Sequence, residues 1–139
     1  MTINRASIIL NYEVDVDIQF ILGIADNIAK RIVLPEGQIS LSFIDDEYMQ
    51  KLNREYRSKD KTTDVLTFCL NDEDMLGDIY ISTDAVRRNA SENSLEYEKE
   101  LSRVIAHSFA HLVGYDHKTD ESYQIIRDFE DFLLKNETK

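Results

Sequence analysis

One stretch of the sequence decides how this chain folds: VIAHSFAHLVGYDH, from Val104 to His117. Between Val104 and Val113 the residues are apolar nearly all round a helix, as in helices that lie inside a protein. We therefore expect this helix to be central and buried, with the other elements packed around it. Gly114 predicts its end, because glycine readily adopts the left-handed conformation that turns the chain sharply.

The same stretch contains all three histidines of the chain, spaced H-x-x-x-H-x-x-G-x-x-H. A helix projects the rings of His107 and His111 from one face, one turn apart. The turn after Gly114 allows His117 to supply a third ligand. Three imidazoles leave one tetrahedral position open, as in a catalytic zinc site, although imidazole also suits other transition metals. The alternative is that these are core or capping histidines with hydrogen-bond partners.

A similar spacing occurs in zinc proteases, which carry a glutamate directly after the first histidine as the general base. This chain has Ser108 there, and a serine hydroxyl is not a base near neutral pH. The protease reading is therefore weak. A metal hydrolase with a different proton carrier, or a metal site without catalysis, remains open.

The rest of the sequence predicts an α/β (α+β) fold, a single compact domain over residues 1–139. Strands and helices alternate early and helices collect late, which favours a mixed four-stranded sheet with helices packed on it. The apolar patterns predict strands near residues 7–12, 39–43, 64–70 and 79–83, a turn over 71–78, and helices near 18–32, 46–56, 84–93, 95–113 and 121–136. Asp45 or Asp46 is expected to cap the second of these helices.

Composition favours a cytoplasmic protein. No apolar run approaches the roughly 18 residues that span a membrane, and the N-terminal residues do not resemble a signal peptide. The single cysteine, Cys69, excludes an internal disulfide and fits a reducing compartment. The formal net charge of −11 argues against broad, nonspecific binding of nucleic acid.

One basic cluster stands out against this acidic background. It is either a solvated helix end and loop or a phosphate-binding patch, and composition alone favours the first. Arg57 suits bidentate contact with phosphate oxygens, or it forms an ion pair with Asp60 or Asp64. The cluster consists of Lys51, Arg54, Arg57, Lys59 and Lys61.

Two carboxylates are candidates to accept hydrogen bonds from the histidine rings and so to orient them toward a metal ion. Asp116 adjoins His117 and could orient another ligand by accepting a hydrogen bond from its ring. Glu100 lies two helical turns before His107 and could do the same, although an ion pair with Arg103 is the simpler role.

Taken together, four segments resemble the YbeY family of metal-dependent bacterial endoribonucleases, in the order and spacing of that family. They cover about the C-terminal two thirds of the chain, and the first 45 residues match only in their strand–helix–strand pattern. The segments are LNREYRSKDKTTDVLTF (Leu52–Phe68), LGDI (Leu76–Ile79), KEL (Lys99–Leu101) and HSFAHLVGYDH (His107–His117).

The resemblance implies one zinc ion held by His107, His111 and His117, and cleavage of single-stranded RNA. The nucleophile would be metal-bound water or the ribose 2′-OH. Arg57 matches an arginine in the family's active-site cleft that is important for activity. The neighbouring Arg54, Lys59 and Lys61 then become substrate-binding residues.

The resemblance further implies a role in ribosomal RNA maturation and ribosome quality control. The expected partners are precursors of ribosomal RNA, with the small ribosomal subunit or ribosome-associated proteins as further candidates. We expect a monomer without membrane association. Two alternatives stay open: a metal-stabilised RNA- or ribosome-binding protein with little or no catalysis, and a metal hydrolase of another phosphorylated substrate.

The chain departs from the usual family pattern at four positions. Ser108 replaces a glycine and Ala110 a leucine within the histidine motif. Thr62 stands where proline is usual before Thr63 and Asp64, and Cys69 stands where proline usually follows the phenylalanine of the strand at 64–70. We expect these changes to affect catalytic rate and loop rigidity more than metal binding, with the Ser108 hydroxyl narrowing the site or contacting substrate.

Overall fold

The computed structural model describes residues 2–3, 6–29, 36–70, 75–112, 128 and 131. The elements follow one another as β1 (Thr2–Ile3), β2 (Ala6–Tyr12), α1 (Ile18–Ala29), β3 (Gly37–Ile44), α2 (Asp46–Arg57), β4 (Val65–Cys69), β5 (Met75–Ser82), α3 (Thr83–Glu92) and α4 (Tyr97–Leu112). The predicted helix at 121–136 lies outside the described residues, except for positions 128 and 131.

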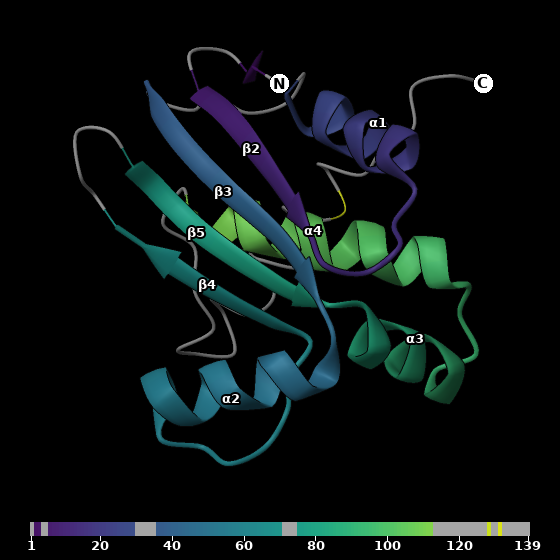
Figure 1. Cartoon of the computed structure of the whole chain (residues 1–139). Helices are drawn as coiled ribbons and strands as arrows, with labels where there is room; N and C mark the ends of the chain where they lie inside the picture. The colour runs from purple at the N-terminus through teal and green to yellow at the C-terminus, as the bar shows by residue number, and fades with distance from the viewer. Residues whose placement is uncertain are drawn as a thin grey trace.

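The strands form one mixed sheet in the order β1-β2-β3-β5-β4 (Figure 1). β3 pairs in parallel with both β2 and β5, whereas β4 pairs antiparallel with β5. The predicted mixed four-stranded sheet is confirmed in β2 to β5. The two-residue β1, which the sequence patterns did not indicate, adds to the outer side of β2. β4 therefore forms the opposite edge of the sheet.

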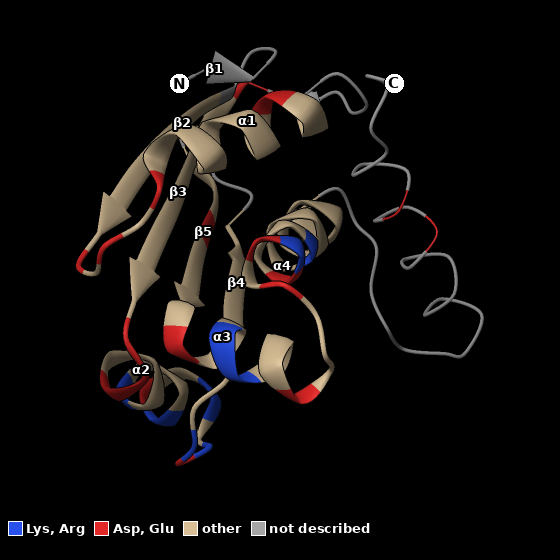
Figure 2. Ribbon diagram, turned by 90° about the vertical axis from the view of Figure 1, so that its right-hand side faces the viewer, with Lys and Arg blue, Asp and Glu red and all other residues tan. Residues whose placement is uncertain are grey.

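The central helix is confirmed. α1 and α4 cover one face of the sheet, and α2 lies toward the other face, beneath the ends of β3 and β5 (Figures 1 and 2). α4 packs against both the sheet and α3, and four of its apolar side chains are 0% exposed. These are Ile105, Ala106, Phe109 and Ala110. Phe109 belongs to the main core, opposite the alternating side chains of β3.

A smaller cluster fixes α2 to the sheet. Met49 and Leu52 of α2 pack with Ile44 at the end of β3 and Leu66 of β4. The helix begins where predicted, because the Asp45 carboxylate accepts a hydrogen bond from the backbone N–H of Tyr48 at 2.9 Å. This packing sets where the C-terminal end of α2 lies relative to β4.

One predicted boundary is wrong. The turn expected over 71–78 extends no further than residue 74, because β5 begins at Met75. Met75, Gly77 and Asp78 pair with β3, and Gly77 and Asp78 also pair with β4. Pairing on both sides thus outweighs the weak strand propensity of Gly77 and Asp78. Among the described helices, none is long and apolar enough to cross a bilayer.

Candidate active site

The histidines of α4 face each other. The Nε2 atoms of His107 and His111 are 3.1 Å apart, and the ring centroids are 4.6 Å apart. Two imidazoles that bind one zinc ion at about 2.0–2.1 Å with tetrahedral angles have nitrogens about 3.3 Å apart. The two rings therefore already converge as a shared ion requires, and imidazole nitrogen is a ligand that zinc accepts.

The predicted metal site has three further members, one ligand and two carboxylates. His117 and Asp116 lie outside the described residues. Glu100 lies on α4 two turns before His107. That it orients a ligand histidine by accepting a hydrogen bond from its ring stays a prediction. Arg103 forms an ion pair with Asp131 at 3.2 Å. The three-histidine site as a whole therefore stays a prediction, of which the structure describes two members.

A cleft of about 510 Å³ surrounds the histidine pair. It passes around the edge of the sheet, because its lining comes from the end of α2, from β4 and from α4. Val65 of β4 packs toward the core under α4, whereas Leu66 packs toward α2. The described lining residues are Tyr56, Arg57, Val65, Leu66, Thr67, Phe68, His107 and His111.

Arg57, the last residue of α2, lies in this cleft with an exposed side chain. It has no ion pair among the described residues. Asp60, one of the partners considered for it, instead pairs with Arg54 at 3.3 Å. The exposed side chains of Lys59 and Lys61 follow in the next loop. Figure 2 shows basic residues gathered at α2 and the loop after it.

The comparisons with known proteins agree with this arrangement. The sequence profile described as Endoribonuclease YbeY matches residues 8–137. This chain belongs to the YbeY family. It is 41% identical to the endoribonuclease YbeY of Desulforamulus reducens over 111 residues, which is 73% of this chain and 72% of that protein. It is 38% identical to that of Flavobacterium psychrophilum over 130 residues, covering 90% and 92% of the two chains.

The fold of a solved structure is also similar. The solution structure of TM1509 from Thermotoga maritima superposes with a TM-score of 0.63 at 27% identity. The match covers 92% of this chain and 88% of that one. The YbeY-like architecture predicted from the four segments is therefore confirmed.

Ser108, where the YbeY pattern usually has glycine, turns its hydroxyl back along the helix and does not line the cleft. Its side chain is fully buried, and its Oγ donates to the carbonyl of Val104 at 3.0 Å. The expectation that Ser108 narrows the site or contacts substrate is thus wrong. A serine inside a helix commonly satisfies its hydroxyl on the carbonyl four residues earlier, which turns it along the helix.

The loop between α2 and β4, residues 58–64, carries Lys59 and Lys61 and is called the basic loop. It is anchored without the proline that is usual in YbeY proteins. Thr62 donates from Oγ1 to the Asp46 carboxylate at 3.0 Å. The buried Asn53 donates from Nδ2 to the carbonyl of Lys61 at 2.8 Å. Ser58 starts the loop in the left-handed conformation, with φ at 56°. Hydrogen bonds at two points therefore hold the segment that carries Lys59 and Lys61.

The two aromatic residues of the cleft are among those that the sequence analysis missed. Tyr56 precedes Arg57, and Phe68 is part of an apolar strand, so neither sequence context suggests a site. The Phe68 ring contacts Tyr56 edge-on at 5.6 Å and Tyr80 at 6.2 Å. Burial and the nearby Asp78 carboxylate raise the pKa of Tyr80 to about 12. Tyr80 therefore stays neutral and donates to Asp78 at 3.0 Å.

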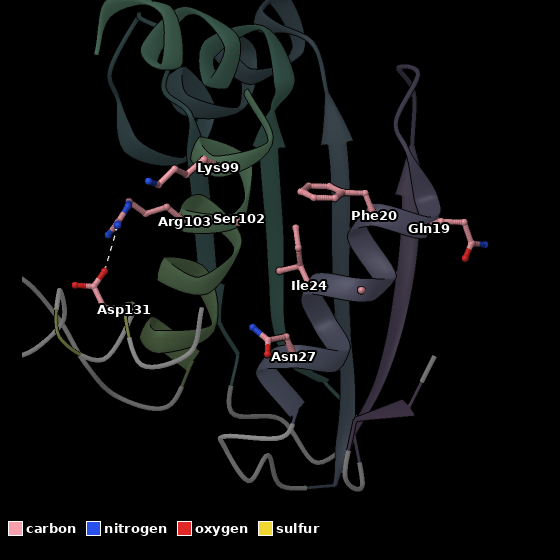
Figure 3. Close-up of a pocket in the computed structure, with 9 residues that line it drawn as sticks. Gln19, Phe20, Ile24, Asn27, Lys99, Ser102, Arg103 and Asp131 are labelled. Atoms are coloured by element: carbon pink, nitrogen blue, oxygen red, sulfur yellow. Dashed lines mark hydrogen bonds and ion pairs between the residues drawn. The ribbon is translucent and has the colours of Figure 1, made fainter. Parts of the chain in front are cut away.

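A larger cavity, of about 780 Å³, lies between α1 and α4. In Figure 3, Phe20, Ile24 and Asn27 of α1 face Lys99 and Arg103 of α4. Among its described lining residues there is no histidine or cysteine. This lining does not suit a transition metal, so size alone does not make this cavity the candidate site.

Proposed function

We propose that this protein is a single-strand-specific, metal-dependent endoribonuclease that acts in ribosomal RNA maturation. The name of its family and of its relatives supports RNA as the substrate. The observation that carries the proposal is that Arg57 and the converging pair His107 and His111 line one cleft. A cytoplasmic location and contact with the ribosome belong to the same proposal.

Arg57 serves as the phosphate-binding residue. A guanidinium group matches the oxygens of a phosphodiester in a bidentate way, and it stays charged at every working pH. Because the side chain has no ion pair among the described residues, binding phosphate breaks no such contact. As negative charge builds up on the phosphoryl oxygens, Arg57 stabilises the transition state more than the ground state.

His107 and His111, together with His117, would hold the zinc ion. When bound, zinc supplies Lewis-acid chemistry, which activates water at neutral pH and polarises a phosphoryl oxygen. Among the described residues, the cleft lining includes no carboxylate. Arg57 therefore contributes positive charge that orients the phosphate, and His107 and His111 contribute ligand nitrogens.

A cleavage assay on single-stranded RNA tests the proposal. We expect Arg57→Ala to lower kcat/KM by about 100- to 1000-fold, the usual cost of losing one group that stabilises transition-state charge. His111→Ala should lose both cleavage and stoichiometric zinc, as measured by elemental analysis. Arg57→Ala should keep its zinc. Ends bearing 2′,3′-cyclic phosphate would identify the ribose 2′-OH as the nucleophile.

Arg87→Ala is the matched control, because it removes an exposed arginine that stacks on Tyr97 away from the cleft. It should cleave as the wild type does. Equal cleavage by all variants would mean that a contaminating nuclease is responsible. RNA binding without any cleavage would instead favour a metal-stabilised binding protein.

A further inference from the structure

We propose that the ring of Tyr56 is a stacking platform for one unpaired nucleobase of the RNA, beside the histidine pair. The inference rests on the proposed function and adds a residue that selects for single strands. Neither the phosphate contact of Arg57 nor the metal site by itself distinguishes an unpaired base from a paired one.

The first observation is the exposure of Tyr56. Its side chain is 65% exposed, more than that of any other large hydrophobic residue among those described. It nevertheless lines the cleft together with Arg57, His107 and His111. An aromatic ring costs free energy when it is left in water, so an aromatic surface at the mouth of a cleft indicates a ligand with an apolar face.

The second observation is that the ring is held in place. Tyr56 and Phe68 meet edge to face at 5.6 Å with an interplanar angle of 69°, and Phe68 meets Tyr80 at 6.2 Å and 80°. The hydrogen bond from Tyr80 to Asp78 fixes the far end of this row. A ring that is already oriented loses little side-chain entropy when a base stacks on it.

The third observation is the charge beside the ring. The adjacent Arg57 and the loop residues Lys59 and Lys61 suit the phosphates of a strand whose base lies on Tyr56. Alternating aromatic and basic groups is the pattern by which proteins bind single-stranded nucleic acid. In a duplex both faces of each base are covered by neighbouring bases, so only an unpaired base can stack on the platform.

The test uses the full-length protein and a short single-stranded RNA that carries one fluorescent adenine analogue. On rapid mixing, before cleavage, the wild type should quench the fluorescence. Tyr56→Ala should lose the quench and raise the Kd by about 5- to 100-fold, the usual effect of removing one stacking partner. Tyr56→Phe, which keeps the ring, should resemble the wild type.

Two controls separate stacking from a structural effect. Tyr12→Ala removes a tyrosine of similar exposure, 54%, that does not line the cleft, and it should bind as the wild type does. On an oligonucleotide that lacks all bases, the wild type and Tyr56→Ala should bind equally. Equal thermal unfolding of the variants would show that the fold is intact.

The outcomes distinguish this inference from the proposed function. If the wild type cleaves RNA and Tyr56→Ala binds and quenches equally well, the stacking platform does not exist. If the quench depends on Tyr56 but no RNA is ever cut, the platform stands and the endoribonuclease proposal fails. A wild type that neither binds nor cuts single-stranded RNA overturns both.

Discussion

At the scale of the residue, the carboxylate of Asp46 connects three parts of the molecule. It accepts hydrogen bonds from Thr62 at 3.0 Å, from Ser82 at 2.9 Å and from Arg88 at 2.7 Å. These partners belong to the basic loop, to the end of β5 and to α3. The hydrogen bond from Arg88 is the main reason that the pKa of Asp46 lies below its usual value of 3.8.

We expect Asp46→Asn to lower the free energy of unfolding at neutral pH by about 1–2 kcal/mol, since the side chain is partly exposed. Because folding lowers this pKa, the stabilising effect is complete above about pH 4 and is lost as the pH falls through the folded-state pKa. Urea unfolding should therefore show the difference between wild type and variant shrinking toward about pH 3. Glu47→Gln, which changes an exposed carboxylate in the same helical turn, should show little difference at either pH.

The loss of stability in Asp46→Asn should differ between neutral pH and about pH 3. A constant difference would mean that the shape of the Asp46 side chain matters and its charge does not. The anchoring of Thr62 would then have a different origin.

At the scale of the element, β5 and α4 approach closely at Gly77. A Cβ atom there would overlap Cδ2 of Leu112, the last residue of α4, and would lie 3.2 Å from the carbonyl oxygen of Phe68. Since Leu112 directly follows His111, this contact helps to set the position of the histidine pair over β4. The thiol of Cys69, the last residue of β4, donates a weak hydrogen bond to the carbonyl of His111 at 3.6 Å and so connects the neighbouring strand to α4 as well.

We expect Gly77→Ala to destabilise the protein by about 1–3 kcal/mol through overpacking. In a Leu112→Ala background the same substitution should cost less, because the overlapping group is gone. A double-mutant cycle by urea unfolding measures this coupling. Strictly additive effects would show that Leu112 is not the obstacle.

Gly23→Ala is the matched control for that cycle. A Cβ atom at Gly23 meets nothing within 4 Å. Alanine favours a helix over glycine by up to about 1 kcal/mol, so this change in α1 should be neutral or stabilising.

At the scale of the whole molecule, charge is distributed unevenly. The chain carries a formal net charge of −11, yet Arg57 lines the cleft and the exposed Lys59 and Lys61 follow it within four residues of the chain. Arg54 is partly neutralised by Asp60. The overall charge repels RNA, and the local cluster attracts it, so binding should depend strongly on salt and orient the strand toward the histidines.

If three cations contact phosphates, the logarithm of the affinity for single-stranded RNA should fall with the logarithm of salt concentration with a slope of about −2. Replacing both Lys59 and Lys61 by alanine should reduce the magnitude of this slope by about 1.4. Fluorescence anisotropy over a series of KCl concentrations measures it. Lys99→Ala, on α4 beside the other cavity, should leave the slope unchanged. An unchanged slope in the double variant would contradict the phosphate contacts.

Features with local causes could be predicted from the sequence. The apolar run from Val104 to Val113 predicts a buried helix, and the spacing of His107 and His111 places both rings on one face of it. The pair Asp45 and Asp46 predicts the start of α2, and the structure identifies Asp45 as the cap. In each case the deciding interactions join residues within one or two turns, so the order of amino acids contains the information. The resemblance to the YbeY family supplied Arg57 in the same way, as a position within a quoted segment.

Other features depend on contacts between distant segments. The sheet order, which makes β4 an edge strand, brings Tyr56 and Arg57 around that edge toward α4. Pairing with two neighbours makes a strand of Gly77 and Asp78, although both residues favour turns. The burial of Ser108 likewise follows from the packing of α4 against the sheet, whereas its hydrogen bond to Val104 is local to the helix. Local pattern thus specifies the helices, most of the strands and the spacing of the two histidines, whereas the cleft arises from packing free energy that is gained only when the elements meet.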